Sequence, residues 1–140
     1  MKINKLIYIF FFYFIFLNNV YSIEPNIFVQ STVDRASKLL SNNISKKQKI
    51  DELQIIAKQT VDIKGIGFYT LGSFRKTLDQ DQKEKYLILF EKYFLKSFSS
   101  RLSEWTNPEI NVISQKVLNK KYTIVNSVLK GTDERPEVKI

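Results

Sequence analysis

The sequence contains no histidine and no cysteine. These two absences exclude a Ser-His-Asp or Cys-His nucleophilic site, thiol redox chemistry, disulfides and the usual Cys/His zinc site. Carboxylate chemistry, lysine chemistry and hard-metal binding are not excluded, but no pair of acidic residues stands out from the helical charge pattern. We therefore expect a protein that is not an enzyme and that needs neither a metal nor a cofactor.

Acidic residues are also missing from the first 22 residues, where 8 of the 19 aromatic residues lie. Residues 1–5 carry two lysines, residues 6–17 form an unbroken apolar run, and small side chains follow at Val20 and Ser22. This order is typical of a secretory signal peptide that is cleaved after Ser22. The alternative is a retained membrane anchor, but 12 helical residues span about 18 Å, against about 30 Å of hydrocarbon core. We expect the mature protein to be exported from the cytoplasm.

Residues 23–140 have the composition of one ordinary soluble domain, with a net charge of +6 once Lys2 and Lys5 are removed from the total of +8. Apolar residues at helical spacing predict amphipathic helices over residues 26–42 and 46–61. Three of the four glycines fall within residues 62–72, which favours a short or kinked helix there.

A longer helix is predicted after this glycine-rich stretch. Asp79 and Gln82 have the spacing of a capping box, and Thr77 with Gln80 offers the same arrangement two residues earlier. The helix can continue to Glu104, since no proline or glycine interrupts it.

Beyond Pro108 the apolar residues alternate, which predicts strands. The sequence Asn119-Lys120-Lys121 predicts a hairpin turn, residues 130–136 a second turn, and residues 138–140 the start of a third strand. Helices followed by strands indicate an α+β fold with N-terminal amphipathic helices packed on an antiparallel sheet. The sheet is narrow for so much apolar helix surface, so we expect a ligand, a partner or further chain to cover it.

The residues from Thr70 to Lys76 (TLGSFRK), the Asp79 cap and the helix KEKYLILFEKYFLKSFSSRLSEW together resemble the MlaC family. The shared pattern is Leu-Gly followed by an aromatic and a basic residue, a cap with glutamine, and a long helix of repeated Phe and Tyr. MlaC proteins are periplasmic phospholipid-binding components of the Mla lipid-transport system. The family continues with further strands and a C-terminal helix, so we expect this sequence to be the N-terminal portion of such a protein.

The resemblance implies a monomeric carrier that moves phospholipid between an inner-membrane ABC-transporter complex and an outer-membrane lipoprotein complex, thereby maintaining outer-membrane lipid asymmetry. Because the protein is expected to be exported, we expect no nucleic-acid partner. Residues 1–22 are then the signal peptide, and residues 23–140 are the lipid-binding domain.

The acyl chains of the lipid would lie in a cavity between helices and sheet. The candidate lining residues are Phe68, Leu71, Phe74, Leu87, Phe90, Phe94, Ile124 and Val128. Each of them has an ordinary alternative as part of a plain hydrophobic core. Arg75 is a candidate for the lipid phosphate, with a solvated surface charge as its alternative.

A second function stays open from the sequence. The chain is then an exported structural or adaptor module, whose apolar faces bury against each other or against a protein partner. Small basic clusters at residues 46–49 and 120–121 would suit anionic membranes or acidic partners, or they serve solubility alone. A filled core without a cavity would distinguish this module from a carrier.

Overall fold

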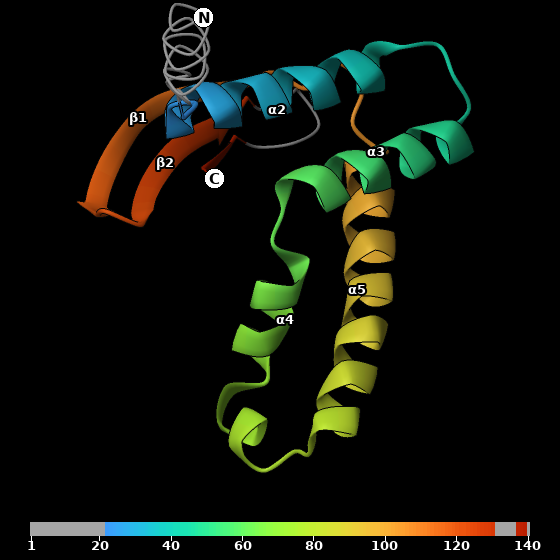
Figure 1. Ribbon diagram of the computed structural model, residues 1–140. Helices are drawn as coiled ribbons and strands as arrows, with labels where there is room; N and C mark the ends of the chain where they lie inside the picture. Colours follow the sequence, from blue (N-terminus) through green and yellow to red (C-terminus); the bar gives the residue numbers. More distant parts are fainter. Residues whose placement is uncertain (1–21, 131–136, 140) are drawn as a thin grey trace, which may run out of the picture.

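The computed structural model describes residues 22–130 and 137–139, so the predicted signal peptide, except for Ser22, and the predicted turn beyond Lys130 lie outside the described residues. The described chain forms helices first and strands afterwards (Figure 1). The elements are α2 (Pro25–Ser41), α3 (Lys46–Thr60), α4 (Ile63–Thr70), the 3-10 turn η1 (Gly72–Lys76), α5 (Gln80–Leu102), β1 (Ile110–Asn119), β2 (Tyr122–Leu129) and β3 (Val138–Lys139). The predicted α+β class is confirmed.

The start of α5 is fixed by the predicted capping box. The Asp79 side chain accepts a hydrogen bond from the Gln82 backbone N–H at 2.8 Å, and the Gln82 side chain accepts one from the Asp79 backbone N–H at 3.1 Å. The alternative cap at Thr77 is not used, because its hydroxyl donates to the Phe74 carbonyl instead. The helix ends at Leu102, two residues before the predicted Glu104.

The helical core forms where α3 and α4 pack against α5. Its buried members are Ala57, Ile63 and Leu95, one from each helix. Half-buried apolar side chains pack around them: Val61, Phe90, Phe94 and Phe98. The other faces of α4 and α5 are not part of this core.

The sheet is antiparallel with strand order β1-β2-β3, and β3 contributes only two described residues. The predicted hairpin is confirmed, with Lys120 and Lys121 as its loop. Asn119 stabilises the turn, since its side-chain oxygen accepts hydrogen bonds from the backbone N–H groups of Lys121 and Tyr122 at 2.9 and 3.1 Å.

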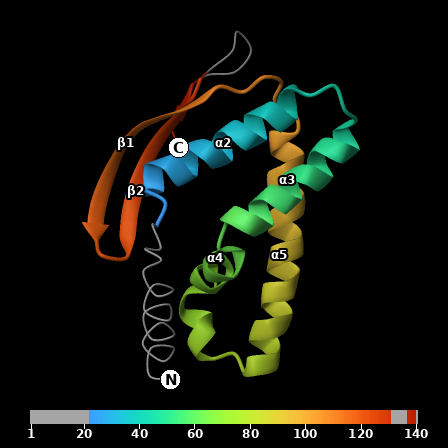
Figure 2. The same cartoon turned by 45° about the horizontal axis from the view of Figure 1, so that its top comes forward.

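Helix α2 connects the two halves of the molecule. It packs on β1 and β2, and it also contacts α3 (Figure 2). Half-buried Gln30 on α2 binds the backbone of β1: it accepts a hydrogen bond from the Val112 N–H and donates to the Ile110 carbonyl. The sheet is therefore held by one helix, while the other helices pack together beside it.

In the described part of the chain, no helix combines the length and the apolar character required to cross a bilayer.

Candidate functional site

A ladder of aromatic rings runs along one face of α5. Tyr86, Phe90, Phe94 and Phe98 follow one another at intervals of four residues, which places them on the same side of the helix. Their ring centroids are 5.9, 6.2 and 5.5 Å apart in sequence order, and each pair is stacked. The rings are half-buried, so the ladder packs on the core and also reaches the surface.

Helix α4 approaches this ladder closely at Gly67. A Cβ atom at this position would lie 2.9 Å from Cδ1 of Phe90 and 3.0 Å from Cδ2 of Leu87. The hydroxyls of Thr70 and Tyr86 lie 2.9 Å apart and form a second link between the helices. The structure thus brings the predicted lining residues Leu87 and Phe90 together against α4, and Phe94 continues the ladder one turn further.

The predicted lining residues on α4 and η1 lie in very different surroundings. Leu71, at the end of α4, is buried. Phe68 is 39% exposed and Phe74 is 68% exposed. Gly72 follows Leu71 with a φ of +54°, a conformation that favours glycine, and it turns the chain into η1. Arg75, the predicted headgroup contact, lies on the exposed surface of η1.

The two predicted lining residues of the sheet lie on β2. Val128 is buried, whereas Ile124 is 45% exposed. In both ribbon views the β1–β2 hairpin lies to one side of α4 and α5 (Figures 1 and 2). The predicted lining residues therefore form a helical group on α4, η1 and α5, and a separate pair on β2.

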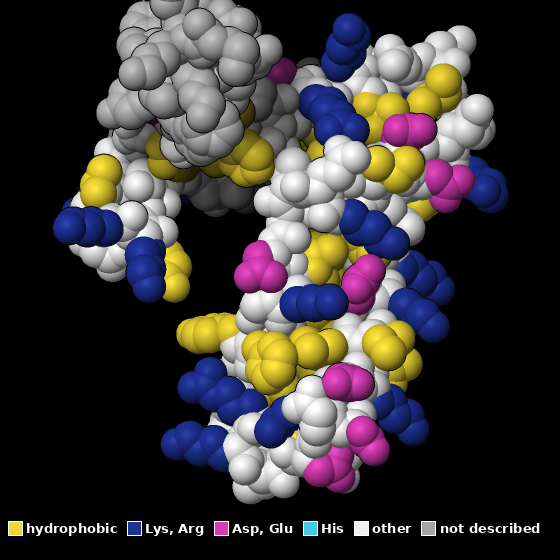
Figure 3. Space-filling model, viewed as in Figure 1, with side chains coloured by type: hydrophobic (Ala, Val, Ile, Leu, Met, Phe, Trp, Pro, Cys, Tyr) yellow, Lys and Arg dark blue, Asp and Glu magenta, His cyan; other side chains and the backbone are white. Residues whose placement is uncertain are grey.

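Among the described residues, the exposed large hydrophobic side chains outnumber the buried hydrophobic ones. Nine hydrophobic residues are buried, whereas sixteen large ones are exposed. Exposed members occur on α4 and α5 and along the β1–β2 hairpin, and Figure 3 shows a group of them over the lower half of the molecule. A monomeric soluble protein rarely exposes large apolar patches without using them for binding.

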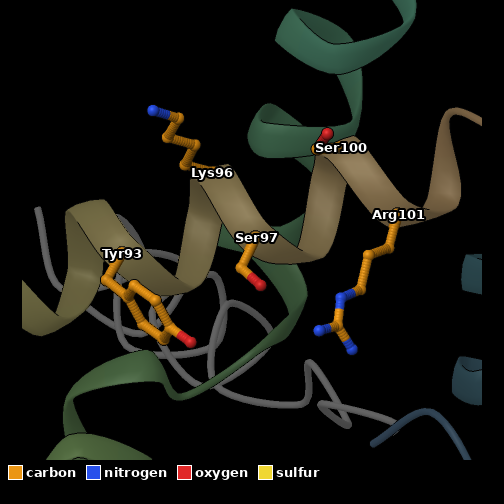
Figure 4. Close-up of a pocket in the computed structure, with 5 residues that line it drawn as sticks. All are labelled: Tyr93, Lys96, Ser97, Ser100 and Arg101. Atoms are coloured by element: carbon orange, nitrogen blue, oxygen red, sulfur yellow. The ribbon is translucent and has the colours of Figure 1, made fainter.

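Among the surface hollows lined by described residues, three border α5, with volumes of about 360, 340 and 310 Å³. The first is lined by Tyr93, Lys96, Ser97, Ser100 and Arg101. Figure 4 shows that Tyr93, Ser97 and Arg101 point to one side of the helix. Of the predicted lining residues, Leu87 lines the third hollow. Volumes of this size lie at the lower end of the range for small-ligand pockets.

Several charged side chains form ion pairs or hydrogen bonds on the surface of the fold. Lys46 and Lys47 of the first basic cluster pair with Glu104 and Asp51, and Lys49 donates to the Leu40 carbonyl. The hydrogen bond with Asp51 raises the pKa of Lys47. Among the described residues, no group of acidic side chains is arranged to hold a metal ion.

Two positions that matter for the packing of α5 were not predicted. Leu95 and Ser99 are its most buried residues, 5% and 0% exposed, and they lie beside the aromatic ladder. The Ser99 hydroxyl donates to the Leu95 carbonyl at 2.6 Å, and Gln54 of α3 donates to Ser99 at 3.4 Å. The sequence did contain one signal of a close helix contact, the small side chain of Ser99 one turn after Leu95.

Comparison with protein families gives a match to the model described as MlaC protein, over residues 30–140. Among solved structures, a phospholipid-binding protein from Ralstonia solanacearum, determined in complex with a phospholipid, has a similar fold. The TM-score is 0.66 at 12% sequence identity, and the match covers 84% of this chain and 68% of the other. The comparison with curated proteins gives no match.

Proposed function

The chain belongs to the MlaC family, and from this premise we propose that it binds a phospholipid and carries it through the periplasm between membrane complexes. The sequence resemblance to this family is thereby confirmed, whereas the cargo and the route are part of the proposal. The solved relative in fold carries a phospholipid, which is the chemistry that the proposal extends to this chain.

The observation that carries the proposal is the excess of exposed over buried large apolar side chains in the described residues. Each methylene moved out of water gains about 0.8 kcal/mol, so a lipid with roughly thirty methylenes needs an extended apolar surface around it. A carrier provides that surface by leaving apolar side chains uncovered until the lipid is bound. No covalent chemistry is required of such a protein.

We propose that the acyl chains contact the helical group on α4, η1 and α5, together with the pair on β2. The contacting residues are Phe68, Leu71, Phe74, Leu87, Phe90, Phe94, Ile124 and Val128. Stacked rings suit this role, because a rigid aromatic wall loses little side-chain entropy when a flexible acyl chain packs on it. Arg75 is the proposed contact of the lipid phosphate.

The proposal also covers location and partners. The signal peptide of residues 1–22 directs export and is cleaved after Ser22, so residues 23–140 act in the periplasm as a monomeric lipid-binding domain. Phospholipid passes between an inner-membrane ABC-transporter complex and an outer-membrane lipoprotein complex. This transfer maintains the lipid asymmetry of the outer membrane.

Native mass spectrometry of the exported protein tests the cargo. We expect a mass adduct of one phospholipid, and we expect lipid-free protein to take up phospholipid from liposomes. The variants Phe68→Ser and Ile124→Ser should weaken retention, since each removes a half-exposed apolar contact. Ile55→Ser is the matched control: Ile55 is 43% exposed on α3, outside the proposed contact surface, and its loss should leave the adduct unchanged.

The proposal would be disproved by folded protein that carries no adduct and also fails to accept lipid from liposomes. A concentration-dependent complex with a protein in place of the adduct would support an exported adaptor module instead.

A further inference from the structure

The segment from Ile63 to Leu78 combines exposed aromatic residues with positive charge. It contains three cations, Lys64, Arg75 and Lys76, and no acidic residue. Tyr69 is 80% exposed and Phe74 is 68% exposed. In both ribbon views, η1 lies at one end of the molecule (Figures 1 and 2). Phe74, Arg75 and Lys76 lie on η1, and Tyr69 lies near the end of α4 just before it.

The exposure of Phe74 does not come from a loose backbone. Its carbonyl accepts hydrogen bonds from the backbone N–H groups of Thr77 and Leu78, at 3.0 and 3.1 Å, and from the Thr77 hydroxyl. Its own N–H donates to the Leu71 carbonyl at 3.1 Å. Because buried Leu71 anchors the turn, Phe74 is held with its ring in solvent. Holding an apolar ring in water is unfavourable unless a partner covers it.

The cations of this turn are available to a partner. Within the described residues, Arg75 and Lys76 form no ion pair, in contrast to Lys46 and Lys47. Figure 3 shows Lys and Arg side chains on both sides of the lower end of the molecule, whereas Asp and Glu side chains there lie mainly on one side. Asp79, the nearest acidic residue in the sequence, is engaged in the cap of α5.

We propose that this turn docks the protein on the surface of an anionic phospholipid bilayer. The docking surface consists of Tyr69, Phe74, Arg75 and Lys76. The Phe74 ring enters the boundary between headgroups and acyl chains, where the amphipathic Tyr69 side chain also fits. Arg75 and Lys76 contact the lipid phosphates. This contact is with the bilayer. Phe74 and Arg75 are also proposed contacts of a carried lipid, so the turn would meet the membrane first and the carried lipid afterwards.

Co-sedimentation with large vesicles tests the docking surface. The probes are vesicles of phosphatidylcholine alone and vesicles with one third phosphatidylglycerol, at low salt. We expect the signal-peptide-free protein to bind the anionic vesicles more tightly. Arg75→Gln with Lys76→Gln should weaken that binding about twenty-five-fold, because each cation at such a surface contributes about fivefold. Phe74→Ser should weaken it about tenfold.

The hairpin supplies matched controls. Lys120→Gln with Lys121→Gln removes the same charge from another exposed turn, and Tyr122→Ser removes an aromatic ring of similar exposure, 65%. These variants should bind nearly as the parent protein does. Circular dichroism and melting temperatures must show that all variants are folded.

Equal losses in the hairpin and η1 variants would overturn the proposal, because binding would then follow net charge alone. The absence of any binding to anionic vesicles would also overturn it. Bilayer binding is measured without reference to a lipid adduct, so the docking surface and the carrier function succeed or fail separately.

Discussion

The Gln30 side chain accepts a hydrogen bond from the Val112 backbone N–H at 3.1 Å, across 82 positions of the sequence. The same side chain donates to the Ile110 carbonyl at 3.5 Å. One amide therefore satisfies a donor and an acceptor at the beginning of β1. In this way α2 is joined to the sheet by directional bonds as well as by apolar contact.

Replacement of Gln30 by alanine should destabilise the fold by about 1–3 kcal/mol, because it leaves a partly buried backbone N–H without its partner. Urea unfolding followed by circular dichroism measures this change. Gln80→Ala is the control, since within the described chain the Gln80 side chain donates to the exposed Glu84 of the same helix and to no other side chain. Equal stability of the two variants would show that the bond to β1 contributes nothing.

The close approach of α4 and α5 at Gly67 sets a size limit. Gly67→Val places methyl groups where Phe90 and Leu87 already lie, so we expect a loss of about 1–3 kcal/mol of stability. Lys64→Val puts the same side chain on an exposed position of α4 and should change stability by less than about 0.5 kcal/mol. If both variants melt alike, the helices separate without cost at Gly67.

Ser99 tests the contact between α3 and α5 in two steps. Ser99→Ala removes the hydroxyl but keeps the volume, and it should cost about 1 kcal/mol or less. Ser99→Leu overfills a site that is completely buried, and it should cost about 1–3 kcal/mol. Equilibrium denaturation of both variants gives the comparison. A leucine variant as stable as the alanine variant would mean that the helices shift apart freely.

The pair Glu109–Lys130 gives a prediction for pH. The hydrogen bond from Lys130, supported by Asn111, lowers the pKa of the Glu109 carboxyl. A lowered pKa in the folded state means that the stabilising effect is present above the ordinary pKa of glutamate, and is lost as the pH falls through the lowered value.

The substitution Lys130→Met should therefore raise the pKa of Glu109 toward its ordinary value. An NMR titration of the carboxyl carbon measures it. Lys116→Met, which removes an exposed lysine of β1, should leave the titration unchanged. An unaltered pKa in the Lys130 variant would assign the shift to another group.

The sequence predicted the features of this fold that depend on near neighbours. The capping box of Asp79 and Gln82 needs only three residues of spacing, and the turn at Asn119 needs a side chain that binds its own backbone. Such features form independently of where the rest of the chain is placed. The same holds for the aromatic ladder of α5, which follows from its four-residue period.

Contacts between distant segments were not predictable in the same way. Several sides of α5 are apolar enough to pack, and the position of α3 decides that Leu95 and Ser99 are the buried ones. Gln30 gave no sign of its role, since a glutamine on a helix is ordinarily a surface residue. In the candidate site, the residue types on α4 and α5 followed from the pattern, whereas the exposure of Phe74 depends on how the Gly72 turn directs the chain.

The long reach from α2 to β1 also sets an order for folding. Gly67 meets Phe90 on the next helix, and β1 meets β2 across a two-residue loop, so these pairs close short loops. The bond between Gln30 and Val112 closes a loop of 82 residues, whose entropy must be lost before the contact forms. We expect pulsed hydrogen exchange during refolding to protect the Val112 amide later than the amides of α5. The contact of α2 with the sheet would then form after the contacts among the helices and within the hairpin.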